Sequence, residues 1–272
     1  MNTKTRDPIF RGAAFTAIAF VLFLFWGCGP KPVKMEQTAP LSPDKFSYGP
    51  WEKILATHVQ EGQVDYSGIQ NSDMDSLNEF LDMIARLDPS SFASTHDELA
   101  FWINVYNAFA VKAVLDGYSP GNIFGRYRFF HSAAFLVGGK PLSLKEIEEE
   151  ILGKRFGDPR TSFAIVAAGR GYPNLQPRPY LGESLNAMLE RAAHEFASDT
   201  SRNRIDTDNE TLYLSKIYSW HAREFAENGG TVKSYFLGYL NKPVEEKKPL
   251  RAYRVKYQSF DWSLNGTPPR SH

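Results

Sequence analysis

The stretch 99-LAFWINVYNAFAVKAVLDG-117 decides the fold of this chain. Its residues are apolar nearly all round, whereas a helix on the surface of a globular protein keeps a polar face. Thr95 and Glu98 stand before it with the Thr-x-x-Glu spacing of a capping box, and Gly117 is a typical helix end. The sequence therefore predicts a long helix at the centre of the domain, which the remaining segments must cover.

Apolar residues at helical spacing predict further helices outside this central one. Ser143 and Glu146 form a second capping box, and that helix should end at Gly153. The other predicted helices span 74–87, 185–196, 215–226 and 231–240. Together these segments make the fold rich in helix.

Strand signals are fewer and shorter. Apolar residues flank tight turns in 135–142 and 205–214, which predicts two hairpins, and 163–167 reads as a short buried strand. Between 253 and 264 the alternation changes phase, which predicts a bulge near Ser259. We expect an α+β fold: a single helix-rich domain with a small, mostly antiparallel sheet around the buried central helix.

The first 28 residues have the pattern of a signal peptide. Basic residues precede an uncharged stretch, 12–26, whose length as a helix is about 22 Å, short of the roughly 30 Å hydrocarbon core of a bilayer. Its end, Phe25-Trp26-Gly27-Cys28, resembles a bacterial lipobox, so we expect lipidation at Cys28, the only cysteine of the chain. The alternative is an uncleaved signal anchor.

Either outcome places the domain outside the cytoplasm and tethers it to a membrane. Gly29 follows the cysteine where an Asp would retain a Gram-negative lipoprotein at the inner membrane, so this resemblance favours the periplasmic face of the outer membrane. Five prolines lie in 29–50, which predicts a tether. The folded domain is then expected over 51–272.

Charge and motif content limit the partners. The 31 basic and 31 acidic residues cancel, which argues against nucleic acid as a partner. We expect the membrane as one partner, through the N-terminal lipid anchor, and a small molecule, a peptide or an envelope protein as another. The histidines lack the spacing of a metal site, and neither a serine-hydrolase elbow nor a P-loop is present, so no metal and no cofactor is expected.

Several polar residues are candidates for chemistry, each with a structural alternative. Asn104 and Asn107 on the central helix either brace neighbouring loops or line a pocket. His131 and His221 are candidate general bases, or satisfied structural histidines. Glu149 lies in the run 146-EIEEE-150, and is either an acid–base group or part of a solvated face.

Asp158 and Arg160 form the last candidate group. Arg160 together with Arg170 would bind a carboxylate or a phosphate through paired hydrogen bonds. The alternative is an internal ion pair between Arg160 and Asp158 or a glutamate.

Five blocks along the chain resemble, in order, the family catalogued as domain of unknown function 547. They are ELAFWINVYNAFAVKAVLDGYSP, FLVGGKPLSLKEIEEEIL, DPRTSFAIVAAGRGYPNL, LYLSKIYSWHAREF and FDWSLNG. The residues that match the family pattern are Phe101, Trp102, Asn104, Tyr106, Asn107, Asp158, Pro159, Gly171, Pro173, Ser215 and Trp220. From the polar candidates and this resemblance together we expect a cleft lined by Asn104, Asn107, Asp158, Arg160, Ala167, Gly171, Tyr172 and Trp220.

The same resemblance implies thiol chemistry that this chain lacks. Members typically carry cysteines at the positions of Ala167 and Tyr172, and histidines at those of Ser162 and Glu149; some are fused to glutaredoxin-like modules. A methyl group cannot attack as a thiolate does, so any cysteine-based reaction of the family is absent here.

We therefore expect a lipid-anchored binding or scaffold domain without catalysis, whose cleft resembles an active site. The alternative is a hydrolase or transferase with a rebuilt acid–base site, in which Asn104 orients the substrate. A structural envelope component would instead need a large exposed aromatic patch.

Overall fold

The structure, a computed structural model, describes residues 39–270. These residues belong to one compact unit, Glu36–His272. The predicted signal peptide over 1–28, with Cys28, and the first part of the predicted tether, 29–38, lie outside the described residues. Among the residues that are described, no helix combines the length and the apolar character that a membrane crossing requires.

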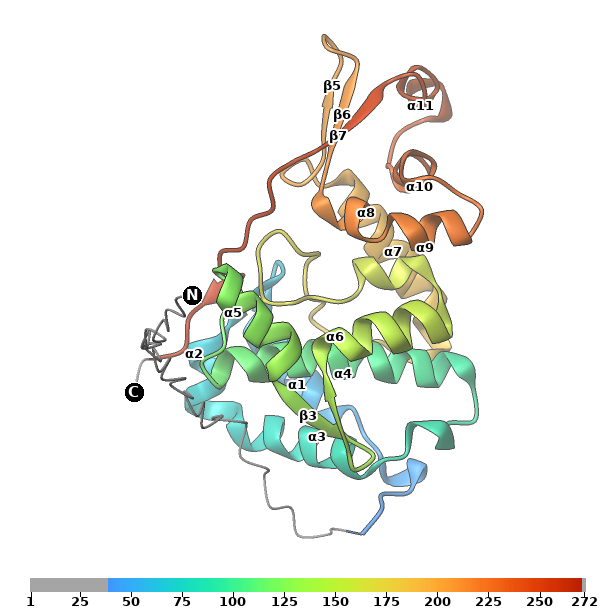
Figure 1. The fold of residues 1–272 in the computed structure, drawn as a ribbon. Helices are drawn as coiled ribbons and strands as arrows, with labels where there is room; N and C mark the ends of the chain where they lie inside the picture. The colour runs from blue at the N-terminus through green and yellow to red at the C-terminus, as the bar shows by residue number, and fades with distance from the viewer. Residues whose placement is uncertain (1–38, 271–272) are drawn as a thin grey trace, which may run out of the picture. The chain divides into compact units, whose positions relative to one another are not determined.

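Helices dominate this unit (Figure 1). The α-helices are α1 (Gly49–His58), α2 (Tyr66–Gly68), α3 (Met74–Arg86), α4 (Thr95–Leu115), α5 (Ile123–Tyr127), α6 (Leu144–Glu146), α7 (Leu185–Ser198), α8 (Lys216–Trp220), α9 (Ala222–Glu227), α10 (Val232–Tyr239) and α11 (Val244–Leu250). The π-helical segments are η2 (Ile69–Asp73), η4 (Arg128–Ser132) and η5 (Ile147–Phe156), and the 3-10 turns are η1 (Pro43–Lys45), η3 (Pro89–Ser91), η6 (Pro159–Phe163) and η7 (Gly182–Ser184).

Helix α4 is the centre of the fold, as predicted. From Glu98 to Val114 its residues are buried, with Lys112 the exception. It lies between α3 on one side and α6 with η5 on the other (Figure 1). Because α4 is covered on all sides, its lack of a polar face carries no cost.

The N-terminal cap of α4 differs from the prediction by one residue. Ser94 has the extended backbone of a cap residue, and its Oγ accepts a hydrogen bond from the Asp97 amide at 3.0 Å. Thr95 is already helical, and the Glu98 carboxylate instead binds Arg155 at 2.7 Å. The predicted Thr95–Glu98 capping box is therefore wrong, because the neighbouring hydroxyl of Ser94 occupies the position with the required backbone angles.

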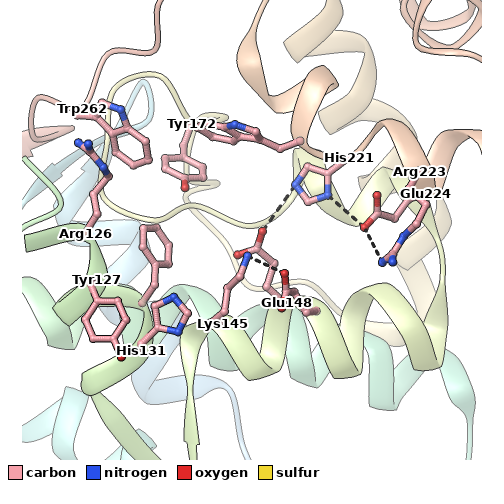
Figure 2. Close-up of a pocket in the computed structure, with 13 residues that line it drawn as sticks. Arg126, Tyr127, His131, Lys145, Glu148, Tyr172, His221, Arg223, Glu224 and Trp262 are labelled. Carbon is pink, nitrogen blue, oxygen red and sulfur yellow. Dashed lines mark ion pairs between the residues drawn. The ribbon is translucent and has the colours of Figure 1, made fainter. Parts of the chain in front are cut away.

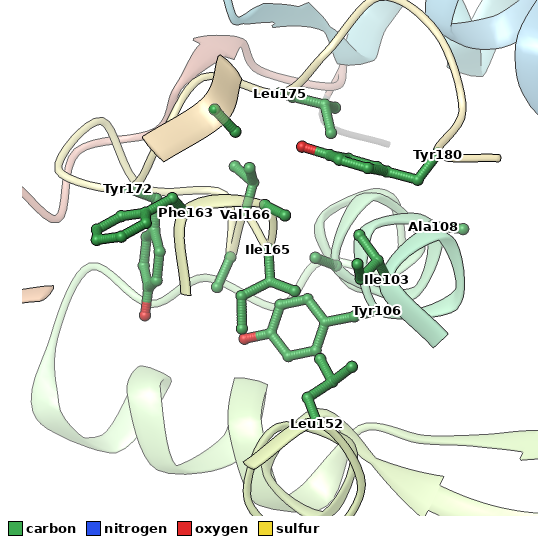
Figure 3. Packing of buried hydrophobic residues seen from close by; sticks show 14 of the residues in the cluster. Ile103, Tyr106, Ala108, Leu152, Phe163, Ile165, Val166, Tyr172, Leu175 and Tyr180 are labelled. Atoms are coloured by element: carbon green, nitrogen blue, oxygen red, sulfur yellow. The ribbon is translucent and has the colours of Figure 1, made fainter. Parts of the chain in front are cut away.

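The core around α4 is built from large side chains of distant segments. Figure 3 shows Ile103 and Tyr106 of α4 packed among Leu152 of η5, Ile165 and Tyr180. All of these side chains are buried. Burial at this level stabilises the fold by roughly 1.5–3 kcal/mol per large apolar side chain.

The strands form small sheets. Within residues 39–270 there are three: β1 (Val59–Gln60), β2 (Gln63–Asp65) and β8 (Gly266–Thr267); β3 (Ala134–Val137) and β4 (Lys140–Ser143); and β5 (Arg204–Asp206), β6 (Thr211–Leu214) and β7 (Arg254–Tyr257). The pairs β1–β2, β3–β4 and β5–β6 are antiparallel, whereas β2–β8 and β6–β7 are parallel. Both predicted hairpins and the prediction of a single α+β domain are confirmed.

The predicted strand over 163–167 is wrong. The 3-10 turn η6 ends at Phe163, and the following residues pair with no strand of the described part of the chain; the bridge between Gly169 and Leu264 is isolated. The Asn107 side chain takes the place of a neighbouring strand: it donates to the Ala164 carbonyl at 3.0 Å and accepts from the Val166 amide at 2.8 Å. A side chain thus satisfies backbone groups that a strand would otherwise pair.

Three other predicted features differ from the structure. The Ser143–Glu146 capping box is confirmed, but its helix continues through η5 and ends at Gly157, which has a positive φ of 65°, rather than at Gly153. The predicted helix over 215–226 is interrupted at His221. Strand β7 ends at Tyr257, and the chain leaves the sheet there instead of forming a bulge near Ser259.

Packing also begins before the predicted start at residue 51. The Leu41 amide donates to the Arg86 carbonyl at 3.0 Å, and the Phe46 ring lies 5.5 Å from that of Phe101 on α4. Pro50 lies in the first turn of α1, where its missing N–H costs nothing. The later part of the predicted tether over 29–50 therefore belongs to the domain.

Candidate functional site

A pocket of about 500 Å³ opens where segments far apart in the sequence meet (Figure 2). Its walls come from α5 with η4, from α6 with η5, from the loop after η6, from α8 with α9, and from the segment before β8. The lining residues are Arg126, Tyr127, Phe130, His131, Lys145, Glu148, Glu149, Tyr172, Trp220, His221, Arg223, Glu224 and Trp262.

An imidazole between two carboxylates lies at one side of this pocket (Figure 2). The Nε2 atom of His221 is 3.8 Å from Oε1 of Glu148, and its Nδ1 atom is 3.9 Å from Oε1 of Glu224. The three side chains are only 14–19% exposed. Both distances exceed that of a direct hydrogen bond, so the imidazole is flanked by the carboxylates without being locked to either.

Each member of this group is positioned by a local feature of the backbone. His221 lies at the break between α8 and α9, and Ser215 caps α8 by accepting from the Ile217 amide. Glu148 projects from the π-helical η5 and accepts a hydrogen bond from the Tyr106 hydroxyl at 3.3 Å. Helix breaks and π-helical turns are frequent at functional sites because they redirect side chains.

The imidazole also affects the ionisation of its neighbour. The contact with His221 is the main cause that lowers the pKa of the Glu224 carboxyl below its usual value, against the opposing effect of burial. Glu224 is therefore held as a carboxylate beside Nδ1. Glu148 lies beside the other ring nitrogen at nearly the same distance, so each nitrogen of the imidazole has a carboxylate next to it.

Aromatic rings form the opposite wall. The rings of Trp220 and Trp262 lie 5.7 Å apart, and Phe260 packs against both, at 4.7 and 4.5 Å. Tyr172 lies edge-on to Phe260 at 5.0 Å. Trp220 is 45% exposed, so this wall offers one indole directly to a ligand.

Tyr172 closes the wall and directs its hydroxyl into the pocket (Figure 2). Burial raises the pKa of this hydroxyl well above its usual value, and the charge of Glu148 raises it further. The phenol therefore stays protonated and is available as a hydrogen-bond donor. It cannot act as an anionic nucleophile at neutral pH.

The pocket brings together five residues that sequence reasoning selected: His131, Glu149, Tyr172, Trp220 and His221. The His131 ring stacks on that of Tyr127 at 4.8 Å, and Glu149 forms an ion pair with Lys145 at 2.9 Å.

Sequence reasoning missed the other eight lining residues, which are Arg126, Tyr127, Phe130, Lys145, Glu148, Arg223, Glu224 and Trp262. Glu224 follows His221 by three residues, a spacing that would have indicated the pair on a helix. Glu148 could not be separated from the other glutamates of its run.

The two asparagines of α4 do not line this pocket, which corrects their assignment to a cleft. Asn104 donates to the carbonyls of Ala100 and Tyr180 and accepts from the Tyr180 amide. Asn107 binds the segment after η6, as described above. Both amides are buried and serve as braces, the structural alternative considered for them.

The pair of Arg160 and Arg170 does not form an anion site. The Arg160 guanidinium binds Asp158 at 2.6 Å and Glu190 at 2.8 Å, and these partners raise its pKa above the usual value for arginine. Arg170 instead donates to the Leu264 carbonyl and borders a second pocket of about 320 Å³. The internal ion pair with Asp158 is the alternative that the structure supports.

Two further residues that were predicted to line the cleft, Ala167 and Gly171, are packed against other parts of the fold. Ala167 is fully buried and lies outside the lining of the pocket. A Cβ at Gly171 would lie 2.7 Å from the Phe260 ring, so glycine permits the aromatic wall to pack against this turn. Among the described residues, no group of three His, Cys, Asp or Glu side chains is arranged to hold a metal ion.

Residues 90–197 match the family model described as "Protein of unknown function, DUF547". This match covers less than half of the chain. The matched stretch contributes Arg126, Glu148 and Tyr172 to the pocket, whereas His221 and Trp262 come from the chain after it. Searches of curated proteins and of solved structures found no match.

Proposed function

We propose that the pocket binds a small molecule through non-covalent contacts, in a protein tethered to a membrane outside the cytoplasm. The observation that carries this proposal is the pocket itself, which sets an indole-rich wall opposite partly buried charges. Cavities of this size that combine aromatic rings with convergent polar groups are typical of ligand-binding sites. In this pocket eight of the thirteen lining residues are charged or histidine.

The resemblance to the family supports the same location. Two of the positions at which members carry reactive groups, Tyr172 and Glu149, line this pocket. A phenol with a raised pKa and an ion-paired carboxylate replace a thiol and an imidazole there. In this proposal the chain retains the cleft of the family but lacks the side chains that would form a covalent bond there.

The N-terminal sequence supports the tether. With lipidation at Cys28, the ligand would be a small molecule or peptide of the cell envelope, met at the periplasmic face of the outer membrane. Metabolic labelling with a fatty acid tests this part. Wild type should incorporate the label and Cys28→Ser should not; equal labelling of both would contradict the anchor.

A second candidate function is acid–base hydrolysis, favoured by the position of His221 between Glu148 and Glu224. Nε2 would take a proton from a water molecule while the water oxygen forms a bond to an acyl carbon. The bond between the acyl carbon and the leaving group would then break as the imidazolium gives this proton to the leaving group, and Glu224 would accept a hydrogen bond from Nδ1 throughout. This reaction needs neither of the family's cysteines.

A screen of the full chain with peptidoglycan fragments, short peptides and small carboxylic acids tests the binding proposal. A ligand should raise the thermal unfolding temperature of wild type and of Val244→Ala, an exposed position on α11. The ligand should leave the unfolding temperature of Trp220→Ala unchanged, because this variant lacks the exposed indole. A shift that Trp220→Ala retains would place the ligand elsewhere and contradict the proposal.

The same ligands separate binding from hydrolysis when products are followed by mass spectrometry. Turnover that disappears in His221→Gln and persists in His131→Gln would favour hydrolysis over simple binding. His131 is the matched control because it lines the same pocket but stacks on Tyr127. Binding without product would favour the first proposal.

A further inference from the structure

We infer that the ligand of this pocket carries a carboxylate, which Arg126 binds, attached to a flat ring that packs on the indole wall. This inference deepens the proposed function and rests on it. It depends on which of the charges that line the pocket already have partners.

Arg126 differs from Lys145 and Arg223, the other lysine and arginine side chains of the pocket, in its partners. Its guanidinium carbon lies 4.6 Å from the centre of the Trp262 ring, and its Nη1 donates to the Pro120 carbonyl at a long 3.4 Å. No carboxylate of residues 39–270 forms an ion pair with it. A guanidinium has five N–H donors, so most of them remain available.

The other two cations, Lys145 and Arg223, already lie beside carboxylates of their own chain. Lys145 binds Glu149 at 2.9 Å, and Arg223 lies 3.6 Å from Glu227 and 3.9 Å from Glu224. An anion that enters the pocket therefore finds one guanidinium that no internal carboxylate competes for.

The stacking on Trp262 also orients the donors of Arg126. When one face of a guanidinium lies against a ring, its N–H groups still point outward in its own plane. Two parallel N–H groups match the two oxygens of a carboxylate. The backbone before Arg126 is held in place because Asn122 Oδ1 accepts from the Gly125 amide at 2.8 Å.

The remaining charges favour an anion with a single negative charge. Glu148, Glu149 and Glu224 line the same pocket, so each additional negative charge on the ligand would be repelled. Tyr172 lines the same pocket and directs its hydroxyl into it (Figure 2). A ring beside the carboxylate would lie against Trp220 and Tyr172.

Pairs of ring compounds that differ only in charge test the inference. Phenylacetate and phenylacetamide have the same shape, and their binding to the full chain can be followed by the indole NMR signals of Trp220 and Trp262. We expect the acid to bind about tenfold more tightly than the amide. Arg126→Gln should reduce the ratio to below about twofold, and Arg126→Lys should retain part of it.

Arg128→Gln is the matched control, because Arg128 is a neighbouring exposed arginine over Tyr118 that does not line the pocket. It should keep the wild-type ratio. The preference for the acid should also weaken with added salt, a readout that needs no variant.

Each outcome separates the inference from the proposed function. If the acid and the amide bind equally and both shift the indole NMR signals of Trp220 and Trp262, the carboxylate inference is wrong. The proposal that the pocket binds a small molecule is then retained. If Arg128→Gln lowers the ratio as much as Arg126→Gln, the effect is general surface charge and the inference is wrong. If neither ring compound binds at the pocket while another ligand of the screen does, the inference is wrong and the proposed function is retained. If none of the screened ligands binds there, the proposed function fails as well.

Discussion

The polar groups of the α4 core and those of the pocket differ in how completely they are partnered. In the core, Asn107 binds one backbone carbonyl and one backbone amide at 3.0 and 2.8 Å. In the pocket, His221 lies 3.8 and 3.9 Å from its carboxylates, and Arg126 makes one long hydrogen bond. Partnered buried groups hold a fold together, whereas groups left partly unpartnered around a cavity are available to a ligand.

The strongest test of the core is Asn107→Ala. The change leaves the Ala164 carbonyl and the Val166 amide buried without their partner, and we expect the free energy of unfolding to fall by about 2–4 kcal/mol. Urea denaturation measures this fall. Asn241→Ala, at an exposed site, should change it by less than about 0.5 kcal/mol. If both changes lowered the free energy of unfolding equally, the hydrogen bonds of Asn107 would not stabilise the core.

Arg160→Met tests whether this arginine belongs with the partnered groups. Loss of its bonds to Asp158 and Glu190 should lower the free energy of unfolding by about 2 kcal/mol. The preference for phenylacetate over phenylacetamide should not change. If Arg160→Met folds stably but loses this preference, Arg160 takes part in ligand binding and the distinction is wrong.

A smaller effect is expected from acid. Hydrogen bonds from Lys53 and His58 lower the pKa of Asp73 from 3.8 to about 2. A carboxyl whose pKa is lower in the folded state stabilises the fold above pH 3.8, and this contribution is lost as the pH falls from about 4 to about 2. We expect it to be roughly 1–2 kcal/mol, because Lys53 is exposed.

The urea midpoint of wild type should therefore decrease over this pH range relative to that of Asp73→Asn. Parallel pH profiles for the two proteins would show that the contacts of Asp73 with Lys53 and His58 do not stabilise the fold in this way.

The smallest change in stability is expected for His221→Gln. Contacts of 3.8 and 3.9 Å contribute little, so the free energy of unfolding should change by less than about 0.5 kcal/mol. The pKa of Glu224 should rise toward 4.5, since His221 is the main cause that lowers it, and NMR titration can follow this carboxyl. A loss of stability as large as that of Asn107→Ala would mean that the pocket histidine is structural.

Local patterns predicted the elements that depend on neighbouring residues. The apolar run of α4, the Ser143–Glu146 cap and the two hairpins are confirmed because each is specified within a few residues. The predicted strand over 163–167 failed for the opposite reason. Its apolar residues are buried, but the partner of its backbone is the Asn107 side chain, more than fifty residues earlier.

The candidate site shows the same division. His221, Tyr172 and Trp220 could be selected from the sequence by residue type and by resemblance. The choice between Arg160 and Arg126 could not, because it depends on which arginine finds carboxylates nearby. Asp158 and Glu190 surround Arg160, whereas Arg126 lies against the indole of Trp262.

The sequence by itself determined that a helix lies buried at the centre, that hairpins flank it and that cysteine chemistry is absent from the domain, because periodicity, turn residues and composition are local properties. Only the tertiary structure decided which polar groups are partnered. Glu148, His221 and Trp262 lie far apart along the chain, and their meeting in one pocket depends on how every intervening segment packs. No short pattern records that packing.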